Sequence, residues 1–341
     1  MSTVGSSPLS GGRLLSVEAA SALIQAGHCL SIAGDEALLR KLPRGVWVGG
    51  TIPYFMAHEG GRTTKDKVFV SVLPQIAARP SVVTYDRRNL PRICTDAPEH
   101  GFTLVILPAF SDIHADFARN APDYEDNFVK PLIGWISGIH LDDLGVAAPM
   151  VVNGDTLEFR TDCAVAVHVP LALDFNAEID IINLFTQGDG DRIQFKDSGF
   201  TAKLCTINGK PARIGDYVKG NQIDTQLPLV ANYHGALINA SIQSVHPTDG
   251  SIQLYGPVFP DIEYRFASPV SDYVSAFRQQ LPRERKPVSF ACNCVLNYLY
   301  CGLEGQSMPD MLGPMTFGEV AYQLLNQTLV YLRVEPAVRT R

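Results

Sequence analysis

Three cysteines stand close together in "VSFACNCVLNYLYC", which runs from Val288 to Cys301. Cys292 and Cys294 are two residues apart, so in a strand their thiols share one face while Asn293 points to the other. Zinc sites usually combine C-x₂-C pairs, and a nucleophilic thiol needs a histidine base that only folding can supply. We therefore weigh three interpretations: buried structural thiols, the lining of a ligand pocket, and a metal or nucleophile site.

Two acidic and histidine-bearing motifs are the other candidates for metal or acid–base chemistry. In "SDIHADF" a helix is expected after the cap at Ser111 or Asp112, and in a helix only Asp112 and Asp116 would share a face, without His114. "GIHLDD", around His140, is typical of a polar loop. Neither motif has the H-E-x-x-H or EF-hand framework, so we predict no metal site.

The double glycine in "GGTIPYF" suggests a place where the backbone comes close to another group. Gly49 and Gly50 end a predicted buried strand, and Thr51 with the following amides could bind a carboxylate or another anion. An ordinary strand ending in a tight turn is the alternative. The sequence has no G-x-G-x-x-G, Walker or G-x-S-x-G motif, so the dinucleotide, nucleotide and α/β-hydrolase classes lack their minimal signal.

"TFGE" fits a capping box, with Thr316 at the N-cap and Glu319 three residues into a helix. Apolar residues follow at helical spacing and form one stripe: Phe317, Val320, Ala321, Leu324 and Leu325. This predicts a helix that turns strand-like in "TLVYLRV". The capping role explains Glu319 structurally, and a functional role for its carboxylate is the alternative.

The elements that must position these residues change in character near residue 149. Residues 13–148 alternate helix and strand signals, including the helices "SVEAASALIQAG", capped by Ser16, and "SDIHADFARNA". From 149 the chain reads as strands with turn signals about every ten residues, including the Asn-Gly hairpin of "INGKPA". A helix with Ser271 as cap follows. We predict an α/β (α+β) fold: a disordered tail over 1–12, an N-terminal α/β module over 13–148, and a largely antiparallel β-rich module over 149–341 closed by helices.

Composition narrows the classes of function. The 341 residues are 46% hydrophobic and 18% charged, which is typical of a globular chain. The net charge of −7 argues against nucleic acid, and no apolar run approaches the ~18 residues that cross a bilayer. Seven scattered cysteines, an odd number, and a start without signal-peptide character predict a reducing, cytoplasmic location.

The order of these features resembles the FIST sensory family (F-box and intracellular signal transduction). "GGTIPYF" stands where that family has a G-C-[ST]-x-x-G-E-like turn, and "GDRIQFKDSGFTAKLCTINGKPARIGDY" matches its long β-rich passage. "VSFACNC" corresponds to its strand ending in Cys, and "FGEVAYQLLNQTL" to its closing signature, which aligns Gly318, Glu319, Asn326, Thr328 and Leu329. The chain departs at Gly50, which replaces the family's turn cysteine, and lacks the Arg expected after the Cys strand.

The resemblance implies a small-molecule-binding sensory protein that acts by binding rather than by catalysis. It would hold an amino-acid-like or other small polar ligand in an interdomain cleft and signal in trans to a protein partner, and oligomerisation is open. The implied ligand-binding residues are Gly49, Gly50, Thr51, Cys292, Asn293, Cys294 and Glu319. Glu319 would orient a cationic group, and the amides of Gly49–Thr51 a carboxylate.

Two alternatives stay open at this point. Some members of the resembled family are proposed to carry haem, which would make the protein a gas sensor; possible axial ligands are His58, His114, His140, His168, His234, Cys292 and Cys294. The other alternative is an enzyme of unknown reaction that uses a Cys or an Asp-His site.

Overall fold

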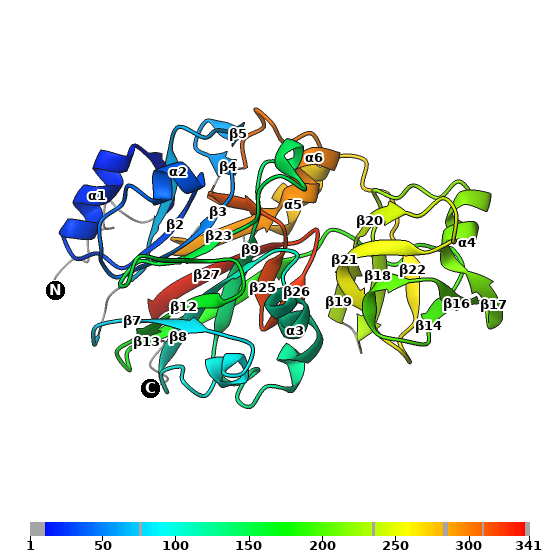
Figure 1. The fold of residues 1–341 in the computed structure, drawn as a ribbon, viewed down its shortest axis with the longest axis horizontal. Coiled ribbons are helices and arrows are strands. Elements are labelled where there is room, and N and C mark those ends of the chain that lie inside the picture. Colours follow the sequence, from blue (N-terminus) through cyan, green and yellow to red (C-terminus); the bar gives the residue numbers. More distant parts are fainter. Residues whose placement is uncertain (1–10, 75–76, 234–235, 282–285, 309, 338–341) are drawn as a thin grey trace.

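A computed structural model describes residues 11–74, 77–233, 236–281, 286–308 and 310–337. It confirms a mixed α and β fold in which strands predominate. Figure 1 shows a large body that contains both ends of the chain, and a smaller lobe at one side. We define the inserted lobe as Ile193–Phe266 and call the rest the body. Of the tail expected over 1–12, residues 1–10 lie outside the described part.

The first body sheet carries the amino-terminal helices. Its strand order is β1 (Arg13–Leu15), β6 (Val68–Val72), β2 (Leu30–Gly34), β3 (Trp47–Thr51), β10 (Val151–Asn153) and β11 (Glu158–Arg160). Helices α1 (Val17–Gln25) and α2 (Glu36–Leu39) pack on it through a small core that includes Ala20, Ile24, Leu39 and Trp47. Ser16 caps α1 as predicted, because its hydroxyl accepts from the Ala19 amide.

The second body sheet positions the helix that matters most for the site. Its order is β26 (Gln323–Leu325), β25 (Glu319–Ala321), β9 (Leu132–Ser137), β8 (Gly101–Pro108), β12 (Ala164–Pro170) and β7 (Ser81–Tyr85). β8 and β9 are parallel, and β8 is followed by α3 (Asp112–Asn120). Short 3-10 turns complete this part: Leu90–Ile93, Ala121–Asp123 and Leu141–Asp143.

The third body sheet contains the cysteine strand. Its order is β13 (Phe175–Ile182), β27 (Leu329–Pro336), β23 (Phe290–Cys294), β24 (Gly313–Thr316), β4 (Tyr54–Ala57) and β5 (Gly60–Thr63). The predicted strand at "FACNC" is therefore confirmed as a central strand, but it ends at Cys294. Helix α6 (Val295–Tyr300) follows directly, and α5 (Tyr273–Gln280) precedes it with Asp272, not Ser271, as its cap.

The inserted lobe has its own core. One sheet runs β17 (Lys210–Arg213), β16 (Leu204–Ile207), β14 (Ile193–Phe195), β22 (Tyr264–Phe266), β18 (Leu229–Tyr233) and β19 (Ala236–Ala240); the other runs β15 (Gly199–Ala202), β21 (Ile252–Val258) and β20 (Ile242–Val245). With α4 (Ile214–Gly220) they enclose a separate apolar cluster. The predicted Asn-Gly hairpin is confirmed, since Ile207 pairs with Lys210 across it.

The change at residue 149 does not divide the sheets. Strands from both sides of it pair in the body: β10 with β3, β12 with β8, and β24 with β4. The boundary predicted there marks where the chain becomes strand-rich, not where a second core begins. The separate core belongs instead to the inserted lobe.

The helix predicted from "TFGE" is wrong. Residues Glu319–Ala321 and Gln323–Leu325 form the hairpin β25–β26, which turns at Tyr322 with φ 63°. Phe317, Val320 and Leu325 are all buried, as are most of their neighbours in this segment. A segment buried on both faces carries apolar residues at almost every position, so helical spacing could be counted in it without a helix being present.

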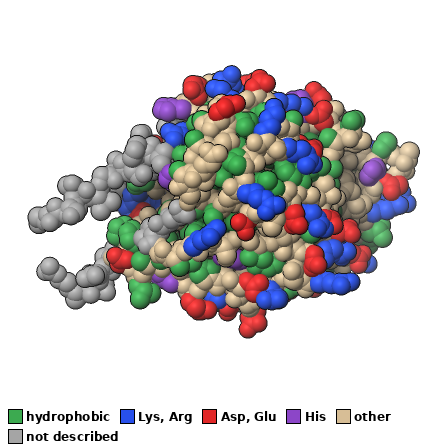
Figure 2. All heavy atoms as spheres, turned by 60° about the vertical axis from the view of Figure 1, so that its left-hand side comes forward, with side chains coloured by type: hydrophobic (Ala, Val, Ile, Leu, Met, Phe, Trp, Pro, Cys, Tyr) green, Lys and Arg blue, Asp and Glu red, His purple; other side chains and the backbone are tan. Residues whose placement is uncertain are grey.

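The surface shows no extended field of one sign on the side turned forward in Figure 2, where acidic and basic side chains are interspersed. Within the described ranges, none of the helices is long and apolar enough to cross a bilayer.

Candidate functional site

The two glycines of "GGT" lie in the packed interior of the body. A Cβ added at Gly50 would meet Trp135 at 2.8 Å and Ile106 at 2.9 Å, so the glycine allows β3 to pack closely on β8 and β9. The backbone does approach another group closely, as the sequence suggested, but that group is protein. Gly49 is similarly enclosed, since a Cβ added there would lie 2.8 Å from the Trp47 ring.

Thr51 is the member of this segment that lines a hollow. Its Oγ1 accepts from the Met150 amide at 2.9 Å, and the residue borders a hollow of about 310 Å³ at the carboxyl ends of β2 and β3. The Lys65–Asp143 ion pair, at 2.7 Å, and His140 also border that hollow. His140 accepts from the Asp142 amide at 3.3 Å, which supports the polar loop predicted for "GIHLDD".

Glu319 and the cysteine strand come together, deep in the body. Glu319 is 0% exposed and its Oε2 accepts from the Thr328 hydroxyl at 2.8 Å and the Thr328 amide at 3.2 Å. Burial raises the pKa of this carboxyl to about 8, although these hydrogen bonds act in the opposite direction. The group is therefore mainly protonated at neutral pH.

The surroundings of Thr316 agree with a protonated Glu319. Thr316 Oγ1 lies 3.2 Å from Glu319 Oε1, 3.0 Å from the Gly318 carbonyl and 3.2 Å from the Asn293 carbonyl. One hydroxyl proton serves only one acceptor at a time. If the protonated Glu319 donates to Thr316 Oγ1, the Thr316 hydroxyl can donate its own proton to one of the two carbonyls. Each of the two protons then has an acceptor.

The two adjacent cysteines are buried thiols. Burial raises the pKa of Cys292 and of Cys294 well above the usual range, and the nearby Glu319 carboxylate adds to this effect. Cys292 Sγ donates to the Gly134 carbonyl at 3.4 Å. A nucleophilic thiol requires the opposite electrostatic environment. Of the three interpretations, the structural thiol is the one that this geometry supports.

No shared hollow joins the glycine segment to the cysteine strand among the described residues. Strand β9 stands between them: Gly50 packs on Trp135, and Cys292 bonds to the neighbouring Gly134. The expected facing arrangement of "GGT" and "CNC" across one cleft is therefore wrong. Apart from Thr51, the predicted ligand-binding residues border none of the four hollows described here.

The cleft between the body and the inserted lobe contains two hollows, on opposite sides of Arg119. The first holds about 280 Å³ and lies where β8 passes into α3, opposite β21 of the lobe. We call it the His114 hollow. The residues that line it include Phe110, Ser111, Asp112, His114, Arg119, Phe200, Gln243, Gln253, Tyr255 and Phe317. The "TFGE" segment supplies Phe317 to its wall.

His114 is the polar residue that distinguishes this hollow. Ser111 caps α3 and accepts from the His114 amide at 3.2 Å, which fixes the helix start and with it the position of the ring. The side chain is 5% exposed, packs edge-on against Phe200 of the lobe at 5.6 Å, and its Nε2 has no hydrogen-bond partner. Burial lowers the pKa of His114 to about 4, so the ring is neutral and can donate or accept.

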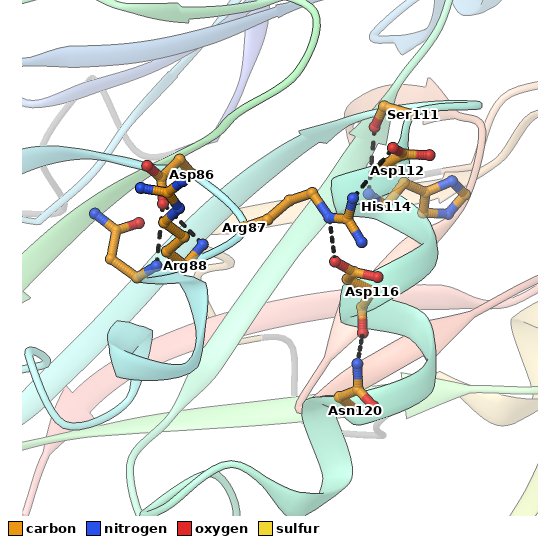
Figure 3. A network of polar contacts seen from close by, with 9 residues as sticks. Asp86, Arg87, Arg88, Ser111, Asp112, His114, Asp116 and Asn120 are labelled. Atoms are coloured by element: carbon orange, nitrogen blue, oxygen red, sulfur yellow. Dashed lines mark hydrogen bonds and ion pairs between the residues drawn. The ribbon is translucent and has the colours of Figure 1, made fainter.

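The acidic residues beside His114 in the sequence pair with Arg87, although Asp112 also borders the His114 hollow. Arg87 donates to Asp112 at 3.2 Å and also bonds to Asp116, and Figure 3 shows the His114 ring pointing away from these ion pairs. The prediction that Asp112 and Asp116 share a face of α3 without His114 is confirmed. No Asp-His pair is therefore assembled at His114, whereas in "GIHLDD" His140 Nδ1 lies 3.5 Å from Asp142 Oδ2.

Phe110 introduces local strain at the mouth of the His114 hollow. Its φ of 61° is in the left-handed region, where a bulky residue is an outlier, and its side chain is 52% exposed. The ring stands edge-on to Phe317 at 5.7 Å. Strained residues of this kind cluster at ligand-binding sites.

Sequence reasoning named His114 only as a metal or haem candidate and did not find the aromatic residues around it. The available signal was the Ser111 cap directly after a buried strand, which places the next helical turn at the strand's carboxyl end. The lobe residues could not be found, because their proximity depends on tertiary contacts. Among the residues that the structure describes, no group of three or more His, Cys, Asp or Glu side chains could hold a metal ion. His234 lies outside that part.

Comparison with known proteins places the chain in a family without assigning an activity. No curated protein matches the sequence. The sequence model of one family, described as a family of unknown function (DUF6976), matches residues 15–335. Because that match spans nearly the whole chain, the protein belongs to the DUF6976 family.

Proposed function

We propose that the protein binds a small polar ligand of the amino-acid class in the His114 hollow and acts as a sensory protein, as its resemblance to FIST domains implies. One observation carries the proposal: the buried His114 Nε2 lacks a partner at the wall of a hollow lined by four aromatic rings. Buried polar groups are normally hydrogen-bonded, and an exception calls for an explanation such as a ligand.

The composition of the hollow suits this class of ligand. Small-molecule sites are mainly apolar with a few polar groups, and their volumes are roughly 300–1,000 Å³, so about 280 Å³ fits a small molecule. Phe200, Tyr255 and Phe317 would enclose its apolar part, and His114 would bond to a polar atom. The exposed Arg119 would hold a carboxylate, in place of the amides of Gly49–Thr51.

Sensing would follow because the walls of the His114 hollow come from both the body and the inserted lobe. Phe110, His114 and Phe317 belong to the body, whereas Phe200, Gln253 and Tyr255 belong to the inserted lobe. A ligand that contacts both sets is bound more tightly when the two parts are held together, so occupancy would favour one lobe position. A protein partner that contacts body and lobe together could detect this change in trans.

Calorimetric titration with a panel of amino acids and small carboxylates tests the proposal. We expect at least one binder, whose affinity falls by about tenfold or more in His114→Ala because a buried hydrogen bond to the ligand is lost. Arg92→Ala is the control, because Arg92 is an exposed arginine that pairs with Asp96 and borders none of the four hollows, and it should leave binding unchanged. The absence of any binder, or equal affinity in His114→Ala, would contradict the proposal.

A haem-binding gas sensor is the second candidate, because the same ring nitrogen is free to bind iron, although a hollow of about 280 Å³ would have to widen to hold a porphyrin. His168 has both nitrogens engaged, by Tyr85 at 2.7 Å and Thr103 at 2.8 Å, whereas His114 Nε2 is free. The absorption spectrum of the purified protein distinguishes the two candidates. A Soret band that His114→Ala abolishes would support haem, and a protein that shows none and takes up no added haemin would exclude it.

A further inference from the structure

The second hollow of the cleft differs from the first in its chemistry. It holds about 470 Å³ and lies beyond Arg119, between the end of α3, the far end of β21 and the hairpin β25–β26. We call it the Asn326 hollow. Its walls are mainly apolar and come from both body and lobe: Ala118, Pro122, Phe128, Ile238, Pro257, Phe259, Pro260, Ile262 and Leu324.

Asn326 provides a buried acceptor in this wall. The residue is 1% exposed, and its Oδ1 has no hydrogen-bond partner. Its other polar groups are used: Nδ2 donates to the Leu325 carbonyl at 3.1 Å, and its own carbonyl accepts from Asn239 at 3.0 Å. The Leu325 contact fixes which end of the amide is oxygen, because the reversed amide would place two acceptors together.

The neighbouring residues enclose this oxygen but do not satisfy it. A Cβ at Gly256 of β21 would lie 2.5 Å from Asn326 Oδ1, so only glycine leaves room for this oxygen at the wall. The side-chain amide of Asn239, which also lines this hollow, already bonds to Asn326 O and forms a mutual pair with Asn183. A donor for Oδ1 must therefore come from outside these groups.

The rim of the hollow has a further apolar feature. Phe128 is 62% exposed and its ring lies 5.9 Å from that of Tyr322, at the turn of the β25–β26 hairpin. An aromatic pair with one exposed ring, that of Phe128, extends the surface that a ligand could cover at the mouth of an apolar hollow. Charged groups at this hollow, Arg119 and Asp123, lie on the α3 side rather than at Asn326.

We propose that the Asn326 hollow is a second ligand site, for an apolar or aromatic small molecule that carries one hydrogen-bond donor, a hydroxyl or an N–H. The apolar walls supply the contact area, and Asn326 Oδ1 accepts from the donor. The site is separate from the His114 hollow, whose distinctive polar group is an imidazole on the other side of Arg119.

Fluorine NMR with para-fluorophenol and para-fluorotoluene tests this proposal, since the two probes match in size but differ in the donor. We expect the phenol to bind at least about tenfold more tightly than the toluene, because the latter leaves Oδ1 unpaired. Asn326→Leu should remove that preference. Equal binding of both probes to the natural protein would overturn the proposal, as it would mean that trapped water already serves the oxygen.

A space-filling variant keeps the test valid if Asn326→Leu does not fold. Ile262→Trp, in a partly exposed position of the wall, should weaken phenol binding by about tenfold or more by occupying the hollow. Ile181→Trp, at an exposed position of β13 outside both hollows, is the matched control and should bind normally. His114→Ala should also leave phenol binding intact. A wrong assignment of the Asn326 hollow can therefore be distinguished from a wrong assignment of the His114 hollow. Undiminished binding in Ile262→Trp would overturn the assignment.

Discussion

At the scale of single residues, burial shifts the pKa values of Glu319 and His114 in opposite directions. Burial disfavours the charged form of each, which raises the pKa of the acid to about 8 and lowers that of the imidazole to about 4. The acid is enclosed by Thr316 and Thr328, whereas the imidazole borders a hollow with one nitrogen free. Burial of Glu319 is best explained by its role in the structure, and the unpartnered nitrogen of His114 is best explained by a ligand.

The pH dependence of stability tests the account of Glu319. Because folding raises its pKa from 4.5 to about 8, the native chain binds more protons than the unfolded chain between these values. The free energy of unfolding should therefore fall as the pH rises through this window, by up to about 1.4 kcal/mol per pH unit. Denaturant titrations of the natural protein and Glu319→Gln at several pH values measure this effect.

Glu319→Gln keeps the shape of the side chain without the titrating proton, so it should lack this contribution and be the more stable protein above pH 8. Glu59→Gln, at an exposed position, should behave like the natural protein. If Glu319→Gln retains the full decline in stability between pH 5 and 8, the decline has another source.

Thiol reactivity tests whether the cysteine strand carries catalytic chemistry. Cys292 and Cys294 are each 1% exposed with raised thiol pKa values, so they should react with iodoacetamide only after unfolding. Cys301 is the one partly exposed thiol among the described residues and should be modified first. Mass spectrometry of a time course locates each modification. Rapid labelling of Cys292 or Cys294 in the native protein would revive the enzymatic interpretation.

At the scale of elements, the sequence predicted those features that depend on local chemistry. The caps at Ser16 and Ser111 and the Asn208-Gly209 hairpin were predicted because a side-chain acceptor or a left-handed turn leaves a local signature. The hairpin β25–β26 was missed because its residues are buried on both faces. The sequence also did not show that the strand of Cys294 turns directly into α6.

The cap of α3 gives a prediction at this scale. Ser111 Oγ donates to the Pro108 carbonyl at 2.6 Å and accepts from the His114 amide, which joins the end of β8 to the first turn of the helix. Ser111→Ala should lower the free energy of unfolding by about 1 kcal/mol, the usual effect of losing an N-cap. Thermal or denaturant unfolding measures it. Ser111→Asp keeps an acceptor and should retain most of the stability, and equal losses in both variants would contradict the capping role.

At the scale of the whole molecule, two apolar cores meet at a cleft that the segment Asn326–Thr328 crosses. Asn326 bonds to Asn239 of the lobe, Gln327 accepts from Ser241 of the lobe at 2.7 Å, and Thr328 turns back to Glu319. Such contacts join residues far apart in the sequence. For that reason neither the inserted lobe nor the cleft could be predicted from composition or periodicity, although the "NQT" signature itself was recognised.

The most direct test of the central claim is the imidazole nitrogen spectrum of isotope-labelled protein during titration with a binder found in the amino-acid panel. The account predicts that the His114 Nε2 signal moves on binding while the His168 signals, whose nitrogens are already bonded, stay in place. A binder that saturates the protein and leaves the His114 signal unchanged would contradict the claim that this hollow is the ligand site.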